Sequence, residues 1–407
     1  MKILLAHNRY QLPGGEDEVY RREREMLLGH GHEVIEYTRD NREIAQYGVG
    51  SKATLAVRTT WAWDTYRQIG TILAEARPDL AHFHNTFPLI SPSAYYACAA
   101  ANVPVVQTLH NPRLLCPSAT LFREGRLCEE CIGRRVALPA IRHGCYQSSH
   151  IRSAAVASMI SVHHWLGTWE QKVNIYVVST EFYRRKFAAA CIPPEKIALK
   201  PHFVDTDPGC TQQSGEYALF NGRLAPEKGV PTLLAAWQKL RGVPLYIRGE
   251  GPLAEAASIA QSQAGSCIIL VPRISRPALF DLIKGASFLV WPSEGHYETF
   301  GLVAIEAFAC GLPVIASRCG VMEEIVHDGR TGLHFTSGDA DDLARKVEWA
   351  WAHPDEMRKM GQNARAEYEA KYTSERNYKM LIDVYQQAIL AREPLVSRDP
   401  RVLRVAD

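Results

Sequence analysis

Residues 291–314 read WPSEGHYETFGLVAIEAFACGLPV and contain a strand, a loop, a helix and the start of a second strand. The apolar run that ends at Trp291 predicts a buried strand, which Pro292 terminates, and a glycine-flanked loop then leads to a helix that begins near Gly301. The first N–H groups of a helix are unpaired and carry the positive end of its dipole. This helix start therefore predicts an anion site that suits a phosphate.

Two glutamates flank this helix start, Glu298 in the loop and Glu306 within the helix. At a helical rise of about 1.5 Å per residue, they would lie roughly 12 Å apart. That distance is comparable to the span between the two sugars across a diphosphate. The spacing predicts a nucleotide-sugar site in which Glu298 accepts from the transferred sugar and Glu306 from the ribose. The alternative is a solvated loop acid and an ordinary helical glutamate, because such pairs also occur by chance.

The composition is that of a globular protein. The chain has 407 residues, 46% of them hydrophobic, and a net charge of +2. Its length predicts about two to three domains, and the near-balanced charge gives no support for a nucleic-acid partner. The ten cysteines indicate mostly reduced thiols. The sequence shows no signal peptide and no long apolar run, so we expect a cytoplasmic protein, with peripheral contact at the inner face of the plasma membrane as an open alternative.

The N-terminal half alternates short apolar strands with amphipathic helices, which indicates a parallel sheet covered on both faces. The first strand leads to the pair Gly14 and Gly15, which opens a helix over residues 16–28. Because ligands bind at the carboxyl ends of parallel strands, this pair is a candidate second anion site; a tight turn is the alternative. His110 ends a later strand at the same edge, where it either binds substrate or caps the strand.

The alternation breaks down into an irregular stretch between residues 111 and 164, which includes a cysteine-rich insertion at 111–150. Four of its cysteines form one C-x2-C pair with two flanking thiols, and they either hold a structural zinc ion or remain ordinary thiols. These residues are Cys116, Cys128, Cys131 and Cys145. His82 and His84 share one side of a strand, but no third ligand is near in sequence, so we interpret them as hydrogen-bonded strand-end histidines.

The alternation resumes near residue 217, after a polar linker. The turn that follows carries Arg223 and Lys228, and it precedes a helix at the sheet edge that also receives the Glu298 loop. Two fixed cations there would neutralise a diphosphate leaving group. A later turn after the strand at 268–271 is a candidate site for a base.

Together these elements resemble the retaining GT-B glycosyltransferases of family 4. The resemblance spans nearly the whole chain and rests on four segments: Gly14–Gly15, the turn 222–229, the turn 249–252 and the stretch 298–314. The cysteine-rich stretch is similar to that of members from bacterial cell-surface and exopolysaccharide synthesis. Two positions depart from the family pattern, Pro272 and Cys319, and they leave the base preference open.

The resemblance implies an α/β GT-B fold, in which two Rossmann-like domains face each other across a cleft. We expect an acceptor-side domain over residues 1–205 and a nucleotide-sugar-binding domain over 206–372. A crossover helix over 373–392 would return to the first domain, and a loose tail would follow over 393–407.

The resemblance also assigns roles by position. The catalytic residues would be His110, Arg223, Lys228 and Glu298, with the two cations on the diphosphate. The donor-binding residues would be Gly14, Gly15, Arg273, Ile274, Phe300, Gly301, Leu302 and Glu306. The donor would be a nucleoside-diphosphate sugar, catalysis would need no metal, and the acceptor hydroxyl would belong to a glycan, a lipid-linked molecule or a small molecule.

The predicted function is transfer of a sugar with retention of configuration, in bacterial surface or secreted glycan synthesis. Two alternatives use the same fold: a nucleotide-sugar 2-epimerase and a non-catalytic nucleotide-sugar-binding protein. The turn with Arg223 and Lys228 argues against the epimerase, which needs acid and base carboxylates.

Overall fold

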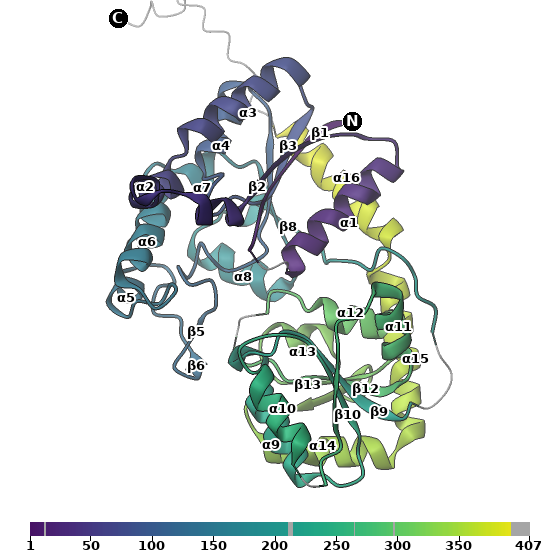
Figure 1. Ribbon diagram of the computed structural model, residues 1–407. Helices are drawn as coiled ribbons and strands as arrows, with labels where there is room; N and C mark the ends of the chain where they lie inside the picture. The colour runs from purple at the N-terminus through teal and green to yellow at the C-terminus, as the bar shows by residue number, and fades with distance from the viewer. Residues whose placement is uncertain (12–13, 211–214, 264, 296–297, 392–407) are drawn as a thin grey trace, which may run out of the picture.

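The computed structural model describes residues 1–11, 14–210, 215–263, 265–295 and 298–391, with the side chains of 49–53 left aside. The predicted tail at 393–407 and the last residue of the predicted crossover helix lie outside the described residues. Figure 1 shows two α/β units, one above the other, with the C-terminal helix α16 returning to the upper one.

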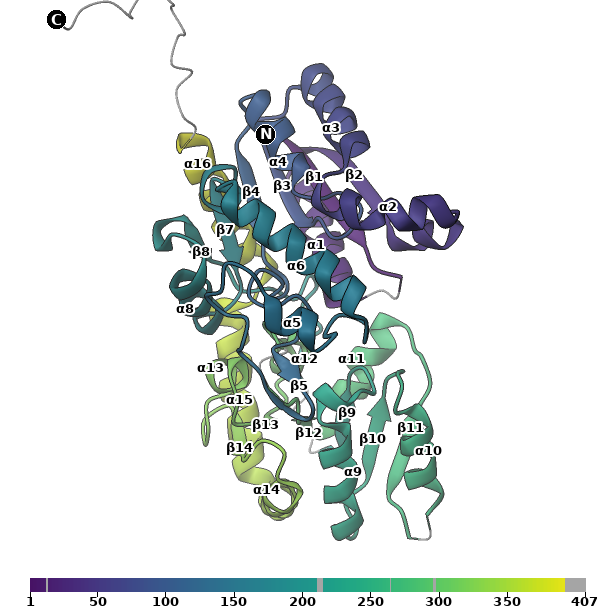
Figure 2. The ribbon, with the colours of Figure 1, turned by 90° about the vertical axis from the view of Figure 1, so that its left-hand side faces the viewer.

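The first unit is built on a parallel sheet of six strands in the order β2-β1-β3-β4-β7-β8. In chain order, these are β1 (Lys2–Arg9), β2 (Glu33–Asp40), β3 (Leu80–Asn85), β4 (Val105–Thr108), β7 (Ile175–Val178) and β8 (Ile197–Leu199). Its helices are α1 (Gly15–Gly29), η1 (Asn41–Gln46), α2 (Val49–Thr60), α3 (Trp63–Ala76), α4 (Ser93–Ala100), α5 (Leu138–Arg142), α6 (His150–Trp165), α7 (Thr168–Gln171), α8 (Glu181–Ala190) and η2 (Pro194–Lys196). A small antiparallel hairpin, β5 (Phe122–Arg123) and β6 (Arg126–Leu127), extends from the insertion toward the second unit (Figure 2).

The second unit is built on another parallel six-stranded sheet, in the order β11-β10-β9-β12-β13-β14. Its strands are β9 (Tyr217–Asn221), β10 (Leu245–Arg248), β11 (Ile268–Val271), β12 (Ala286–Trp291), β13 (Val314–Ser317) and β14 (Gly332–Phe335). Its helical segments are η3 (Pro226–Lys228), α9 (Val230–Lys239), α10 (Ala254–Ser262), α11 (Arg276–Lys284), α12 (Leu302–Ala309), α13 (Val321–Ile325), α14 (Ala340–Ala352) and α15 (Pro354–Lys371). The predicted fold class, two Rossmann-like parallel sheets in an α/β protein, is confirmed.

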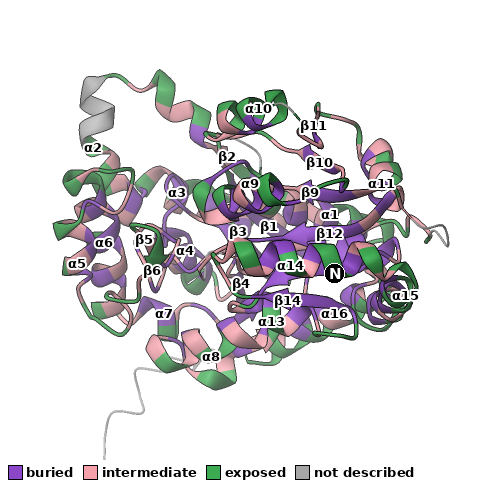
Figure 3. Cartoon of the chain, turned by 90° about the horizontal axis from the view of Figure 1, so that it is seen from below, coloured by how far each residue is buried: buried purple, intermediate pink, exposed green. Residues whose placement is uncertain are grey.

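Helices cover both faces of each sheet, which explains why the strands read as continuous apolar runs. Every residue of β3, β4, β7, β13 and β14 is buried. Figure 3 shows this pattern from below, with buried strands between helices whose outer faces are exposed.

The helix α16 (Ser374–Leu390) crosses back to the first unit. Its buried face, which includes Leu381, Val384 and Ala388, packs in one apolar cluster with Ile3 and Val106 of the first sheet. None of the helices in the described residues is long and apolar enough to cross a membrane.

The region between residues 111 and 164 is more regular than predicted, because α6 occupies its last part. Ser149 caps this helix by accepting from the Arg152 N–H group. The buried face includes the small or polar residues Ser153, Ala157 and Ser161, so the apolar spacing that indicates a helix is weak in the sequence.

Candidate active site

The loops after β9 and β12 meet because these strands are neighbours at the point where the order of the second sheet reverses. In open parallel sheets, ligands bind in the crevice at this switch point, outside the carboxyl ends of the strands. The backbone N–H of Glu294 in the β12 loop donates to the carbonyl of Glu227 in η3 (3.0 Å). This bond brings the turn with Lys228 against the loop with Glu298.

Glu298 is the centre of a polar cluster at the switch point, with 11% of its side chain exposed. Its Oε1 contacts the ammonium of Lys228 and accepts from Ser293 Oγ (2.8 Å) and Trp291 Nε1 (3.3 Å). Burial raises the pKa of Glu298, but Lys228 and these hydrogen bonds outweigh it, and the net shift of the pKa is downward. The carboxylate is therefore held in its charged form.

Gly301 is required where the loop turns into α12. Its φ is 100°, in the left-handed region that favours glycine, and a Cβ there would lie 2.1 Å from the Trp291 ring. The helix begins only at Leu302, so the segment between Glu298 and Gly301 is not helical. A helical rise applies only within a helix, so the assumption behind the predicted distance of roughly 12 Å does not hold for this segment, and the distance itself stays a prediction.

The N-termini of α1 and α12 face each other. The two glycines at the start of α1 are Gly14, its N-cap, and Gly15, and a Cβ added at Gly15 would lie 3.6 Å from Leu302 Cδ1. The two predicted anion sites therefore come together, with one helix from each unit.

His110 lies beside the same loop. Its carbonyl accepts from Thr299 Oγ1 (2.8 Å), while its buried ring shares a hydrogen bond with His84 (Nε2 to Nδ1, 2.9 Å). Burial lowers the pKa of His110 well below its ordinary value, and the neighbouring His84 and His202 lower it further. The imidazole is therefore neutral.

The remaining predicted site residues differ in their exposure to solvent. Arg223 is exposed and pairs with Glu227 on its own turn. Arg273 is exposed and Ile274 is half-buried. Phe300 is buried, and its ring packs edge-on against His202 and Tyr372, which indicates a supporting role for this side chain.

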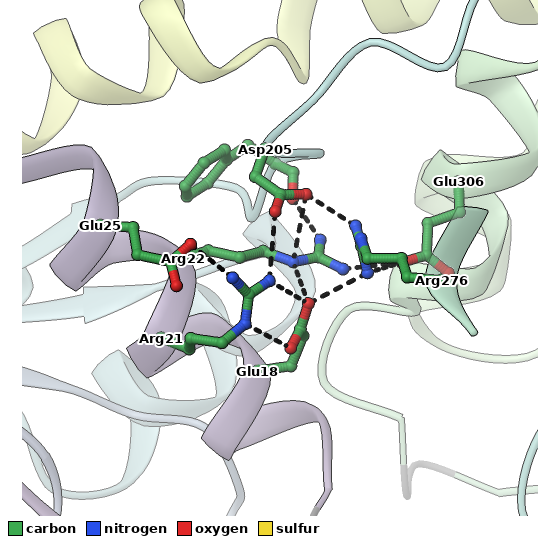
Figure 4. A network of polar contacts seen from close by, with 8 residues as sticks. Glu18, Arg21, Arg22, Glu25, Asp205, Arg276 and Glu306 are labelled. Atoms are coloured by element: carbon green, nitrogen blue, oxygen red, sulfur yellow. Dashed lines mark hydrogen bonds and ion pairs between the residues drawn. The ribbon is translucent and has the colours of Figure 1, made fainter. Parts of the chain in front are cut away.

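Glu306 lies in the second turn of α12 and is held by two arginines. Its Oε1 accepts from Arg22 Nη2 (2.7 Å) of α1 and lies 3.4 Å from Arg276 Nη1 of α11 (Figure 4). These arginines were not identified from the sequence. Nothing in the sequence signalled Arg22, whereas Arg276 follows the predicted base-binding turn by two residues.

Two further polar groups near the cleft were also missed. Ser293 is the second residue after the end of β12, a position that could have signalled its contact with Glu298. Glu16, in the first turn of α1, accepts from Asn111 Nδ2 (2.7 Å), and its Oε2 is buried without a partner among the described residues. Burial raises the pKa of Glu16.

The cysteines of the insertion converge in space. All four predicted zinc ligands line one cavity of about 20 Å³, together with Arg123 and His143. The lining cysteines are Cys116, Cys128, Cys131 and Cys145. Each carries a free thiol, and burial raises the pKa of Cys131 to about 11.

A different group, Glu23, His82 and His84, is the one among the described residues whose potential metal-ligand atoms all lie within 4.8 Å of one another. Lys200 Nζ already neutralises Glu23 (2.6 Å). The two ring nitrogens of His82 bond Tyr385 and Thr108 (2.8 Å each). The group is thus a buried polar network with its own cation, in which Glu23 Oε2 and His84 Nε2 lie 3.3 Å apart but have no hydrogen-bond partner among the described residues.

Two family models match the two halves of the chain. Residues 13–208 match Glycosyltransferase Family 4, and residues 211–367 match Glycosyl transferases group 1. Together with the fold, these matches identify the chain as a GT-B glycosyltransferase of the family 4 type.

Curated relatives match part of the chain. An uncharacterized glycosyltransferase of Methanocaldococcus jannaschii is 33% identical over 173 residues, which cover 42% of this chain and 48% of that protein. The D-inositol 3-phosphate glycosyltransferase of Mycobacterium marinum is 30% identical over 200 residues, or 45% of this chain and 42% of that protein. The chain thus spans less than half of the length of these relatives.

Solved structures share the fold across both units. A sucrose-phosphate synthase from Thermosynechococcus elongatus superposes with a TM-score of 0.71 at 18% identity, covering 96% of this chain and all (100%) of that one. Anabaena HepE in complex with UDP gives a TM-score of 0.65 at 17% identity, covering 95% and 100%.

Proposed function

We propose that this chain is a retaining glycosyltransferase that moves a sugar from a nucleoside-diphosphate sugar to an acceptor hydroxyl without a catalytic metal. The observation that carries the proposal is the Lys228–Glu298 pair at the switch point, beside the start of α12. In this proposal residues 206–372 bind the donor, residues 1–205 face the acceptor, and the helix within 373–392 joins the two.

In the proposed donor site, different groups bind the diphosphate and the transferred sugar. Lys228 and the free N–H groups of α12 bind the diphosphate, and Arg223 swings from Glu227 to join them. Glu298 accepts from hydroxyls of the transferred sugar. Fixed positive groups stabilise the charge that develops on the departing phosphate, which is the electrostatic role that a divalent metal has elsewhere.

The proposed transfer takes place on one face of the sugar. The bond between the anomeric carbon and the phosphate oxygen breaks, and a bond from the acceptor oxygen forms on the same side. The acceptor proton passes to the departing phosphate, so the configuration is retained. His110, which is neutral, contacts the transferred sugar by hydrogen bonding rather than by charge.

A donor panel tests this proposal. UDP-sugars come first, because HepE has been solved with UDP and with UDP-glucose; GDP- and ADP-sugars complete the panel. We expect one donor to raise the melting temperature, and that donor to support transfer with retained configuration in EDTA. Inversion of configuration would refute retention, and loss of activity in EDTA that Mg²⁺ or Mn²⁺ restores would refute the metal-free mechanism. Binding without transfer or hydrolysis across acceptors would favour the non-catalytic alternative.

The proposed acceptor is a glycan, a lipid-linked molecule or a small molecule in bacterial surface or secreted glycan synthesis, reached from the cytoplasm. The proposal includes contact with the inner face of the plasma membrane through exposed apolar side chains of the first unit, Trp63, Ile151 and Trp165. Co-sedimentation with phosphatidylglycerol vesicles is the expected result. Full recovery in the supernatant would contradict it.

We also propose a structural zinc ion at the four cysteines of the insertion, because all four line one cavity, although their sulfur atoms would have to move closer together to share an ion. Purified protein should contain about one zinc per chain by elemental analysis. Cys131→Ser should lose the metal and Cys267→Ser, which changes a thiol of the second unit, should keep it. Zinc content unaffected by Cys131→Ser would refute the site.

A further inference from the structure

We infer that Arg22, a residue of the first unit, positions Glu306 of the second unit to recognise the ribose hydroxyls of the donor. This inference rests on the proposed function, in which Glu306 accepts from the ribose. It adds that the donor site is completed by a side chain from the opposite unit.

Arg22 reaches from α1 to α12, and each of its three guanidinium nitrogens donates a hydrogen bond (Figure 4). Its Nη2 donates to Glu306 Oε1 (2.7 Å), its Nη1 to the Phe203 carbonyl (2.6 Å) and its Nε to Glu18 Oε1 (2.9 Å). Its side chain is only 1% exposed. A buried arginine with partners on three segments has one orientation, so the carboxylate that it holds is also fixed.

Arg276 supports the same carboxylate from the other side. Its Nη1 lies 3.4 Å from Glu306 Oε1 and 3.0 Å from Glu18 Oε1, and its Nη2 donates to Asp205 Oδ1 (2.7 Å). Both arginines thus use the same oxygen of Glu306. In the described part of the chain no hydrogen bond or ion pair occupies Oε2, which leaves that oxygen to accept from hydroxyls.

The arrangement makes ribose recognition depend on both units. Glu306 comes from α12 of the second unit, whereas Arg22 and Glu18 come from α1 of the first. Without Arg22, the carboxylate would keep its contact with Arg276 but lose the partner that fixes its direction. An ordinary interdomain salt bridge is the competing explanation, and it predicts an effect on stability alone.

A cycle of protein and ligand changes separates the two explanations. Binding of UDP, 2′-deoxy-UDP and 3′-deoxy-UDP would be measured by calorimetry for the native protein, Arg22→Gln and Arg21→Gln, with the GDP series in parallel. Arg21 is the matched control, because it neighbours Arg22 and contacts the same Glu18 and Asp205 but, among the described contacts, not Glu306. Arg22→Lys is a second variant that keeps the buried charge if Arg22→Gln does not fold.

We expect the native protein to bind one deoxy nucleotide about 10-fold more weakly than the parent nucleotide. Arg22→Gln should reduce this ratio to about 2-fold or less, with Arg22→Lys between them, while Arg21→Gln keeps the full ratio. An unchanged ratio in folded Arg22 variants would overturn the inference and leave the proposed function intact. If the native protein binds none of the three nucleotides of the donor panel, UDP, GDP and ADP, the proposed donor site itself fails.

Discussion

The two sheets each have six parallel strands, but their carboxyl edges differ in chemistry. The second sheet presents an ion pair, Lys228 with Glu298, whereas the first presents buried histidines. Burial lowers the pKa of His84 and His110, and it lowers that of His202 to about 3, so these rings are neutral. A diphosphate leaving group needs fixed charge, and an acceptor hydroxyl does not. In the proposed mechanism, the charged edge would bind the donor and the neutral edge would face the acceptor.

The largest expected effect is on the charged edge. Glu298→Gln removes the charge that Lys228 faces and the acceptor for the sugar, so kcat/KM should fall roughly 100-fold or more, with little change in melting temperature. Glu294→Gln is the matched control, since Glu294 lies in the same loop and accepts from Thr232. Equal activity of Glu298→Gln and Glu294→Gln would show that the charge of Glu298 is not needed, and the contrast between the two sheet edges would lose its charged side.

Gly301→Ala tests whether the charged edge depends on a fixed helix start. The added methyl group meets Trp291 at a positive φ, so we expect a loss of about 1–3 kcal/mol in the free energy of unfolding, measured in urea. Gly242→Ala is the control, because its φ is also positive (72°) and nothing lies within 4 Å of the added group. Similar losses in the two variants would show that strain alone, and not the contact with Trp291, is responsible.

The neutral edge should be sensitive to acid. The pKa of His202 is about 3 in the folded protein and 6.5 as its ordinary value, so below about pH 6.5 the unfolded chain binds a proton that the folded one does not. Stability should therefore fall with acidification, and His202 alone should account for about 2 kcal/mol at about pH 5. The free energy of unfolding, measured in urea, decreases between pH 7 and pH 5. In His202→Asn this decrease should be smaller by that amount. A slope equal to that of the native protein would show that this ring is not held neutral.

The smallest expected effect concerns the base-binding turn. If the base is bound through the main chain of residues 273–274, Arg273→Ala should change the donor KM by less than about 3-fold, since this side chain is exposed. A change of 10-fold or more in initial-rate kinetics would mean that the side chain itself contacts the donor.

Most strands of the two sheets were predicted from the sequence. Strands that are buried on both faces are continuous apolar runs, and these differ from the 3.6-residue period of a surface helix. The sequence also predicted that the turn with Lys228 and the loop with Glu298 meet, since both follow strands at one switch point. The strand β8 (Ile197–Leu199) was missed because it is only three residues long.

What the sequence did not reveal are the contacts between distant segments. Arg22 and Glu306 are 284 positions apart, and no local pattern marks one of several arginines in α1 as buried. The buried network around Glu23 was missed for the same reason, since its partner Lys200 lies beyond β8. Such pairs depend on how the two units are placed, which periodicity and turn residues do not encode.

The return of α16 to the first sheet has a consequence for biosynthesis. Asn377 bonds Lys200, Tyr385 bonds His82, and the apolar face of α16 covers the first sheet. A ribosome makes residue 200 long before residue 377. Until translation ends, the first sheet therefore has an uncovered apolar face, and Lys200 lacks one of its partners. The first unit to emerge is therefore the last to be completed, and a fragment of residues 1–205 should aggregate unless α16 is supplied to it.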